Sequence, residues 1–107
     1  MHAYMTQFSY TTEAWQALMK NPEDRTGVLK AVIEKLGGRL LCLYYCYGDY
    51  DGIAIAEYPD EIASVATVLS AVSGGHLKAV KTTVLLSAED AVKAMSKAGA
   101  IVYPAPK

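Results

Sequence analysis

The chain has 107 residues, of which 52% are hydrophobic and 20% charged, a composition typical of one folded domain rather than a disordered segment. Its 10 basic and 11 acidic side chains nearly cancel, so electrostatics gives no case for a nucleic-acid or acidic-membrane partner. No apolar run approaches the roughly 18 residues that would span a bilayer, and residues 1–8 lack the basic and apolar segments of a signal peptide. We therefore expect a cytoplasmic protein.

The N-terminal residues predict a strand followed by a short helix. Residues 3–10 are rich in aromatic and β-favouring side chains. One face of such a strand would carry Tyr4, Thr6, Phe8 and Tyr10. Thr11 or Thr12 can cap the helix that follows. The apolar face of that helix would be Trp15, Leu18 and Met19.

A second helix is predicted to follow almost immediately. Asn21 suits its N-cap and Pro22 its first helical position. Apolar residues then recur at helical spacing as Val28, Leu29, Val32, Ile33 and Leu36. Gly37 and Gly38 are typical of a helix end.

Residues 40–47 form a run of β-prone residues without a charge. A strand this apolar is typical of one that is covered on both faces, because a half-exposed strand alternates with polar residues. Helices can cover one face of a small sheet. We expect a partner to cover the other.

The rest of the chain predicts a hairpin, two more strands and two more helices. Residues 48–52 are a turn cluster before a strand over 53–58. A helix beginning at residues 59–61 should carry an apolar stripe, namely Ile62, Val65, Ala66, Leu69 and Val72. Its other face is rich in alanine and serine, which allows close approach of another surface. A strand over 77–86 is followed by a helix that Ser87 caps. That last helix should turn inward Ala91, Val92 and Met95.

This order predicts an α+β fold, the ferredoxin-like βαββαβ arrangement with an extra C-terminal helix. Right-handed crossovers give an antiparallel sheet of order 4-1-3-2, with both crossover helices on one face. The opposite face would be bare, which favours a homodimer or a higher homo-oligomer that forms a dimeric α/β barrel. We expect a single domain over residues 1–99 and a tail over 100–107.

The hairpin carries a family resemblance. Gly48-x-Tyr50-Asp51, the apolar strand after it and Glu57-x-Pro59-Asp60 resemble the signature of the GYD domain family. Further matching pieces are Tyr4-x-Thr6, Arg25, Leu36-Gly37-Gly38 and Gly75-His76-Leu77-Lys78, so the resemblance covers residues 3–95. Gln7 and Ser9 depart from it, because they stand where the family usually has an apolar and a basic residue.

The resemblance implies a dimeric α/β barrel whose relatives mostly lack an assigned activity. Similar folds serve cofactor-independent monooxygenases, haem-degrading enzymes, lactone isomerases and assembly modules, so the fold does not select a reaction. Haem-degrading relatives use a histidine near the position of His76. Here Gln7 stands where their strand has an asparagine, and no tryptophan lies on the preceding helix. We expect no cofactor and no metal site.

Glu57 is the candidate catalytic residue, because it is the only acid in the apolar stretch 53–58. Partial burial would tune it towards a general base. A neighbouring Lys81 would instead hold it ionised in a structural pair, and a place at the strand end would leave it in solvent. Asp51 either bonds the backbone of its turn or acts as an acid or base. Tyr50 suits packing, an interface or a ligand.

Two function classes follow. The first is a small dimeric barrel that binds or transforms a small apolar or aromatic molecule without a tightly bound cofactor. Its candidate ligand-binding residues are Tyr4, Thr6, Tyr45, Tyr50, Asp51, His76 and Lys81. The second is a non-catalytic assembly module whose sheet face serves only oligomerisation. A hollow on which Tyr4, Thr6, Tyr45, Glu57 and Lys81 converge would favour the first.

Overall fold

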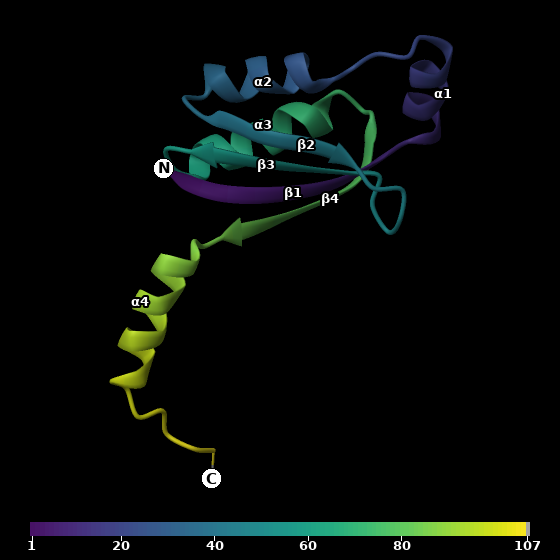
Figure 1. The fold of residues 1–107 in the computed structure, drawn as a ribbon. Coiled ribbons are helices and arrows are strands. Elements are labelled where there is room, and N and C mark those ends of the chain that lie inside the picture. Colours follow the sequence, from purple (N-terminus) through teal and green to yellow (C-terminus); the bar gives the residue numbers. More distant parts are fainter. Residues whose placement is uncertain (107) are drawn as a thin grey trace.

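The fold is an antiparallel sheet with two helices on one face and a third helix projecting from the other side (Figure 1). The computed structural model describes residues 1–106, so Lys107 of the predicted tail lies outside the described residues. The strands are β1 (His2–Tyr10), β2 (Arg39–Tyr45), β3 (Gly52–Tyr58) and β4 (Leu77–Leu85). The helices are α1 (Thr12–Lys20), α2 (Thr26–Lys35), α3 (Glu61–Ser73) and α4 (Ala88–Gly99).

The strand order β2-β3-β1-β4 is the predicted order read from the other edge. All three strand pairs are antiparallel. The α+β, ferredoxin-like topology with an extra C-terminal helix is therefore confirmed. No helix within residues 1–106 is long and apolar enough to cross a membrane.

The core lies between the sheet and helices α2 and α3. Alternation along β3 buries Ala54, Ala56 and Tyr58, while the residues between them stay partly exposed. The register sets Tyr4 of β1 opposite Ala56, and the Tyr4 and Tyr58 rings meet edge to face with centroids 5.7 Å apart. Ile33 of α2 closes this cluster at 1% exposure. The predicted grouping of Tyr4, Thr6, Phe8 and Tyr10 on one face of β1 is thus confirmed, and this face is the one that meets the helices.

Three helices begin with the side-chain caps that the sequence indicates. The Thr11 Oγ1 accepts a hydrogen bond from the Ala14 amide at 3.2 Å. The Asp60 carboxylate caps α3 at 2.9 Å, and the Ser87 hydroxyl caps α4 at 3.0 Å. Each cap satisfies a backbone N–H that has no partner inside its helix.

The predicted start of the second helix is wrong. Asn21 ends α1, with its amide donating to the Ala17 carbonyl, and α2 begins only at Thr26. The Asp24 carboxylate accepts a hydrogen bond from the Thr26 amide at 2.9 Å. Hydrogen bonding to the Thr26 side chain, and then to this amide, lowers the pKa of Asp24. Asp24 therefore organises the helix start that the sequence assigned to Asn21 and Pro22.

The structure decides which face of α3 meets the sheet. The helix buries its small residues Ala63, Ser64 and Thr67 against the sheet. The larger apolar residues face outward, with Ile62 79% and Leu69 62% exposed. Helical periodicity places the two groups on different faces but does not say which face meets the sheet, and here the small side chains do.

The predicted apolar face of α4 is exposed, whereas that of α1 is exposed only at Met19, with Trp15 and Leu18 partly buried. On α4, Val92 and Met95 are 62% and 68% exposed rather than turned inward. On α1, Met19 is exposed, and Ala14 is the buried residue. Strand β2 is covered on one face only, so Tyr44 keeps 66% of its surface exposed. The structure thus leaves more apolar surface open than the sequence predicts for one chain.

Gly27 within α2 and Gly38 shortly after it give a matched stability test. A Cβ at Gly38 would lie 2.6 Å from the Glu57 carbonyl oxygen and 2.8 Å from Ile33 Cγ2. We expect Gly38→Ala to lower the free energy of unfolding by about 2 kcal/mol, because this backbone contact has no room to relax. A Cβ at Gly27 meets nothing within 4 Å, so Gly27→Ala should raise the free energy of unfolding by about 0.5 kcal/mol. Urea denaturation followed by circular dichroism measures both, and equal effects would contradict the close approach at Gly38.

Candidate functional site

A cavity of about 320 Å³ lies between the sheet and helices α2 and α3. It exists because both layers present small side chains where they face each other. Ala54 and Ala56 project from β3, and Thr67, Ser70 and Ala71 line the cavity from α3. Protein interiors are normally filled to crystal-like density, so small residues on both sides leave a hollow. Its size falls at the lower end of small-molecule sites, which span roughly 300–1,000 Å³.

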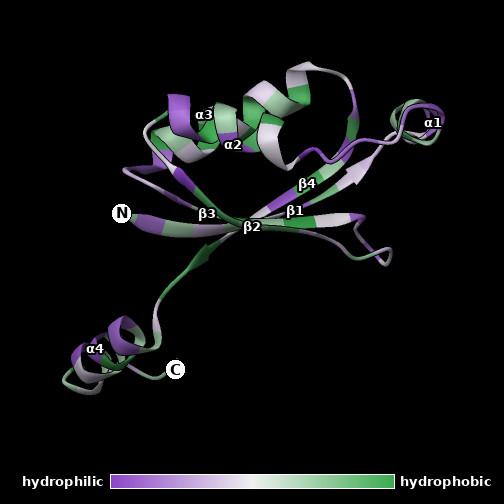
Figure 2. Cartoon of the chain, turned by 45° about the horizontal axis from the view of Figure 1, so that its top comes forward, coloured by the Kyte–Doolittle hydropathy of each residue, from purple (hydrophilic) through white to green (hydrophobic). Residues whose placement is uncertain are grey.

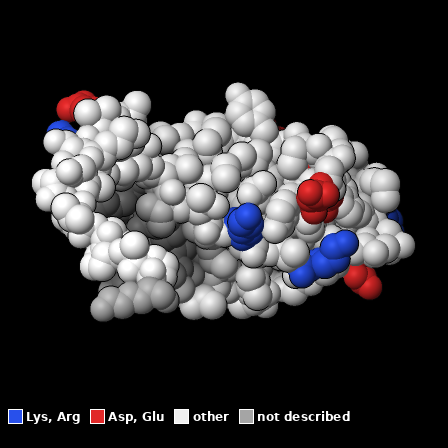
Figure 3. All heavy atoms as spheres, turned by 90° about the horizontal axis from the view of Figure 1, so that it is seen from below, with Lys and Arg blue, Asp and Glu red and all other residues white. Residues whose placement is uncertain are grey.

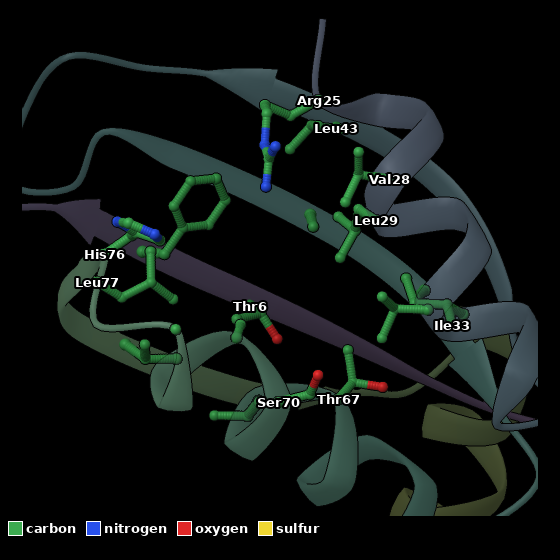
Figure 4. A pocket seen from close by; sticks show the side chains of 18 of the residues that line it. Thr6, Arg25, Val28, Leu29, Ile33, Leu43, Thr67, Ser70, His76 and Leu77 are labelled. Carbon is green, nitrogen blue, oxygen red and sulfur yellow. The ribbon is translucent and has the colours of Figure 1, made fainter. Parts of the chain in front are cut away.

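Most of the wall of the cavity is apolar. Figure 4 shows Val28, Leu29 and Ile33 approaching from α2, opposite Thr67 and Ser70 of α3. The other apolar and aromatic residues that line it are Tyr4, Phe8, Tyr10, Val32, Leu43, Tyr58, Val68, Leu77 and Val80. A ligand inside would exchange water for hydrocarbon over most of its surface.

Two basic side chains lie at the edge of the cavity. Arg25 precedes α2 and reaches towards the hollow, and His76 lies beside Leu77 where β4 begins (Figure 4). The Arg25 Nη1 donates to the Glu23 carboxylate at 2.7 Å, with both side chains about half exposed. A pair this exposed is weak, so Arg25 keeps donors for another anion. None of the described residues that line the cavity is acidic.

Two tyrosine hydroxyls of the cavity, those of Tyr10 and Tyr58, are neutral donors at ordinary pH. Burial raises the pKa of Tyr10 far above its usual value, and the hydrogen bond to Tyr45 raises it further. The positive charge of Arg25 acts on Tyr10 in the opposite direction, which places Arg25 near this ring. Burial also raises the pKa of Tyr58. Neither phenol can act as a base near neutral pH, so these groups orient a ligand rather than accept protons.

Asp51 has a structural task next to the cavity. One carboxylate oxygen, Oδ2, accepts the Tyr10 amide at 2.9 Å and the Trp15 indole N–H at 3.1 Å. Its own amide donates to the Phe8 carbonyl at 2.8 Å. Asp51 therefore fixes the hairpin to the end of β1 and to α1.

The aromatic residues around Asp51 pack together. Tyr45 shares a hydrogen bond of 3.2 Å with the Tyr10 hydroxyl, and its ring lies close to those of Trp15 and Tyr47. The Tyr50 carbonyl accepts the Gly48 amide within the turn. Tyr45, Tyr50 and Asp51 thus build the wall and hairpin beside the cavity rather than its lining.

Glu57 and Lys81 lie on the opposite face of the sheet. Alternation places Glu57 with Ile53 and Ile55, away from the buried Ala54 and Ala56. Its partner there is Arg39, whose Nη2 lies 2.6 Å from the carboxylate. Lys81 stands opposite Gln7 on the edge strand, whereas Glu57 stands opposite Ala3, so the two do not pair with each other.

Of the eight candidate residues, the structure brings Tyr4, Thr6 and His76 together at the cavity. It does not bring Glu57 or Lys81 there. Sequence reasoning missed Arg25 and Ser70 as lining residues. The signal was present in part: small residues recur along one side of α3, and two facing small-residue surfaces leave space.

The fold resembles that of several solved structures. A transcriptional regulator from Neisseria meningitidis, solved with L-Met, superposes with a TM-score of 0.56 at 16% identity, covering 81% of this chain and 51% of the regulator. This chain therefore spans about half the length of the regulator. A Thermus thermophilus protein gives a TM-score of 0.53 at 16% identity, covering 82% of this chain and 96% of that protein. A Pseudomonas aeruginosa protein gives 0.51 at 17% identity, covering 80% and 92%. At these identities the likeness shows the fold alone.

A sequence comparison assigns the family. No curated protein matches this chain. The family model of the GYD domain matches residues 4–95, which include the hairpin with Asp51, both crossover helices and most of the lining of the cavity. The chain belongs to the GYD domain family.

Proposed function

We propose that this protein binds one small, largely apolar molecule bearing a single anionic group in the cavity between the sheet and helices α2 and α3. The observation that carries the proposal is the composition of the lining, which is apolar apart from a few hydroxyls, with Arg25 and His76 at its edge. None of the described residues that line the cavity is acidic. An apolar cavity with few convergent polar groups is the usual form of a small-molecule site.

The chemistry supports a carboxylate as the anionic group. The planar guanidinium of Arg25 matches a carboxylate with two parallel hydrogen bonds. The imidazole of His76 offers a further N–H donor. Buried tyrosine and threonine hydroxyls along the wall can orient the apolar part. Glu57 has no role in this proposal, because it faces the other side of the sheet and pairs with Arg39.

One protein of this fold has been solved with a ligand of that class. The Neisseria regulator was solved with L-Met, which shares the unbranched apolar side chain and the carboxylate but also carries an ammonium group. Its fold likeness carries no residue over to this chain. The proposal here depends on the cavity itself.

We also propose that the protein is a homodimer formed through the outer face, the side of the sheet opposite α2 and α3. The outer face consists of Met5, Gln7, Cys42, Tyr44, Ile53, Ile55, Glu57, Lys81 and Thr83, as alternation and register place them. Figure 3 views the molecule from this side and shows a surface with few charged side chains. An apolar sheet face of this kind is typical of an interface. A dimer without a ligand would be the assembly module, so both function classes include this interface.

Binding can be measured by calorimetry with octanoate and 1-octanol, which share an alkyl chain and differ in charge. We expect both to bind saturably and Arg25→Met to weaken octanoate about tenfold or more, since a hydrogen bond to a charged group contributes about 1.5–3 kcal/mol. The affinity for 1-octanol should stay the same. Lys30→Met, a change on the exposed side of α2, is the matched control and should alter neither affinity.

A cavity-filling variant tests the place of binding. Ser70→Leu adds volume at the rim from a position that is exposed on α3, so the fold should survive. We expect it to weaken octanoate and 1-octanol alike. If neither probe binds the unmodified protein, or if Ser70→Leu changes neither affinity, the cavity is not the ligand site.

A further inference from the structure

The C-terminal arm, defined here as α4 with residues 100–106, has an apolar side that packs against nothing in its own chain. Val92 and Met95 are mostly exposed, and so are Ile101 and Tyr103 in the extended segment. Glu89 and Asp90 both pair with Lys93 on the polar side of the helix. A helix of 12 residues is marginal in water on its own. The arm therefore needs an apolar surface to pack against.

The placement of the arm excludes most of its own chain as the surface on which the arm packs. Only Leu86 and Ser87 separate β4 from α4, and α4 projects on the side of the sheet opposite α2 and α3 (Figures 1 and 2). The radius of gyration is 17.3 Å, whereas a compact domain of this length has about 13 Å. The arm extends away from the body of its own chain.

The outward stripe of α3 is a surface of matching kind and length. It consists of Ile62, Val65, Leu69 and Val72, all between 44% and 79% exposed. Glu61 is the only charged residue of α3. A helix of 13 residues without further charge is suited to an apolar helix and unsuited to an ionic partner. The α3 stripe and α4 are nearly equal in length.

We infer that the arm of each copy crosses to a second copy and packs its apolar side on the outward α3 stripe of that copy. The inference rests on the homodimer proposed above. When two outer faces meet, each helix layer lies outside, and each α4 leaves its sheet on the side of the partner. Packed sheets lie about 10 Å apart, and α4 is about 18 Å long. Residues 100–106 extend the arm beyond α4, so the arm is long enough to pass the edge of the partner's sheet.

The energetic argument favours exchange over an exposed arm. The α3 stripe and the arm are two apolar surfaces that a single soluble chain would leave in water, and monomers rarely expose contiguous patches above a few hundred Å². The exchanged arm covers both at once. It also adds to the outer-face contact, bringing the interface towards the roughly 800 Å² per subunit of a stable complex.

Cross-linking between two different copies tests the exchange directly. Cys42→Ala and Cys46→Ser first remove the native thiols. One population then carries Leu69→Cys and an affinity tag, and the other carries Met95→Cys without a tag. After mixing and treatment with a short bismaleimide, we expect a tagged species of twice the chain mass. Lys97→Cys, on the polar side of α4, replaces Met95→Cys as the matched control and should give at most a tenth of that product.

Three outcomes decide the inference. Cross-linking inside a single chain that carries both cysteines, without the mixed product, would show that the arm folds onto its own α3 and would overturn it. A dimer that Tyr44→Asp disrupts but that forms no Leu69–Met95 product would overturn the exchange and leave the dimer standing. If the unmodified chain is monomeric, the dimer and the exchange both fail, while octanoate binding is unaffected.

The dimer affinity gives a second readout. We expect Met95→Glu to raise the dimer dissociation constant at least tenfold, because it places a charge against the partner's α3. Lys97→Glu should leave it within twofold. Equal effects of the two variants would contradict the packing assigned to Met95.

Discussion

Replacing Tyr44 with aspartate is expected to convert the dimer into monomers at micromolar concentration. Tyr44 lies on the outer face, opposite Ile53 of β3, and its side chain is mostly exposed in the single chain. Burying several hundred Å² of this face per subunit contributes on the order of 10 kcal/mol before association costs. A buried unpaired carboxylate costs several kcal/mol, so the dissociation constant should rise at least about 100-fold.

Light scattering coupled to size exclusion measures this effect. Because Tyr44 is exposed in the monomer, the variant should keep its fold and its circular dichroism spectrum. Met19→Asp, an apolar-to-acid change at an exposed position of α1, is the control and should stay dimeric. Tyr45 is the wrong probe, because it lies on the helix side and bonds Tyr10. A variant that remains dimeric would place the interface elsewhere.

Asp51→Ala is expected to cause the largest loss of stability among the hairpin residues, about 3 kcal/mol. Its carboxylate accepts two N–H groups that are part-buried, from the Tyr10 amide and the Trp15 indole. Each hydrogen bond to a charged group contributes about 1.5–3 kcal/mol, and the orphaned donors pay a desolvation cost. The loss should also release α1 from the hairpin.

Guanidinium denaturation followed by fluorescence reports both effects, because Trp15 is the only tryptophan. The variant should unfold at lower denaturant concentration, and its native emission should shift to longer wavelength as the indole becomes exposed. Asp49→Ala changes an exposed acid of the same turn and should alter stability by less than about 0.5 kcal/mol. Equal stability of the two variants would show that Asp51 does not anchor the hairpin.

The order of the elements followed from the sequence because local signals were strong. Helix caps at Thr11, Asp60 and Ser87 and the glycine pair after α2 mark element ends by backbone chemistry alone. Alternation along residues 3–10 separated the two faces of β1 correctly. These signals depend on neighbours in the chain, so a single sequence carries them.

The orientation of α3 and α4 could not be predicted from the sequence, because it depends on which surface each helix packs against. Periodicity showed that α3 has one face of large and one of small residues, but the usual expectation that large residues face the core was wrong. The small face meets the sheet and leaves the cavity. The large face and the apolar side of α4 are left for a surface outside the single chain.

The candidate site was predictable only in part for the same reason. Tyr4 and Thr6 follow from alternation on β1, whereas the sequence does not show which way the face of β3 that carries Glu57 points. Arg25 lines the cavity from the position just before α2, which begins at Thr26 rather than at the predicted Pro22. A hollow is a property of two facing layers, and no local pattern measures the distance between them.

Methyl NMR during a titration with octanoate tests the central claim most directly, because neighbouring residues of β3 send their methyl groups to opposite faces. Ala54 and Ala56 line the cavity, whereas Ile53 and Ile55 lie on the outer face. We expect saturable shifts at Ala54, Ala56 and Ala71, with Ile53, Ile55 and Met5 unchanged. Shifts confined to Ile53, Ile55 and Met5, or no saturable shift at any methyl group, would contradict a ligand site between the sheet and the helices.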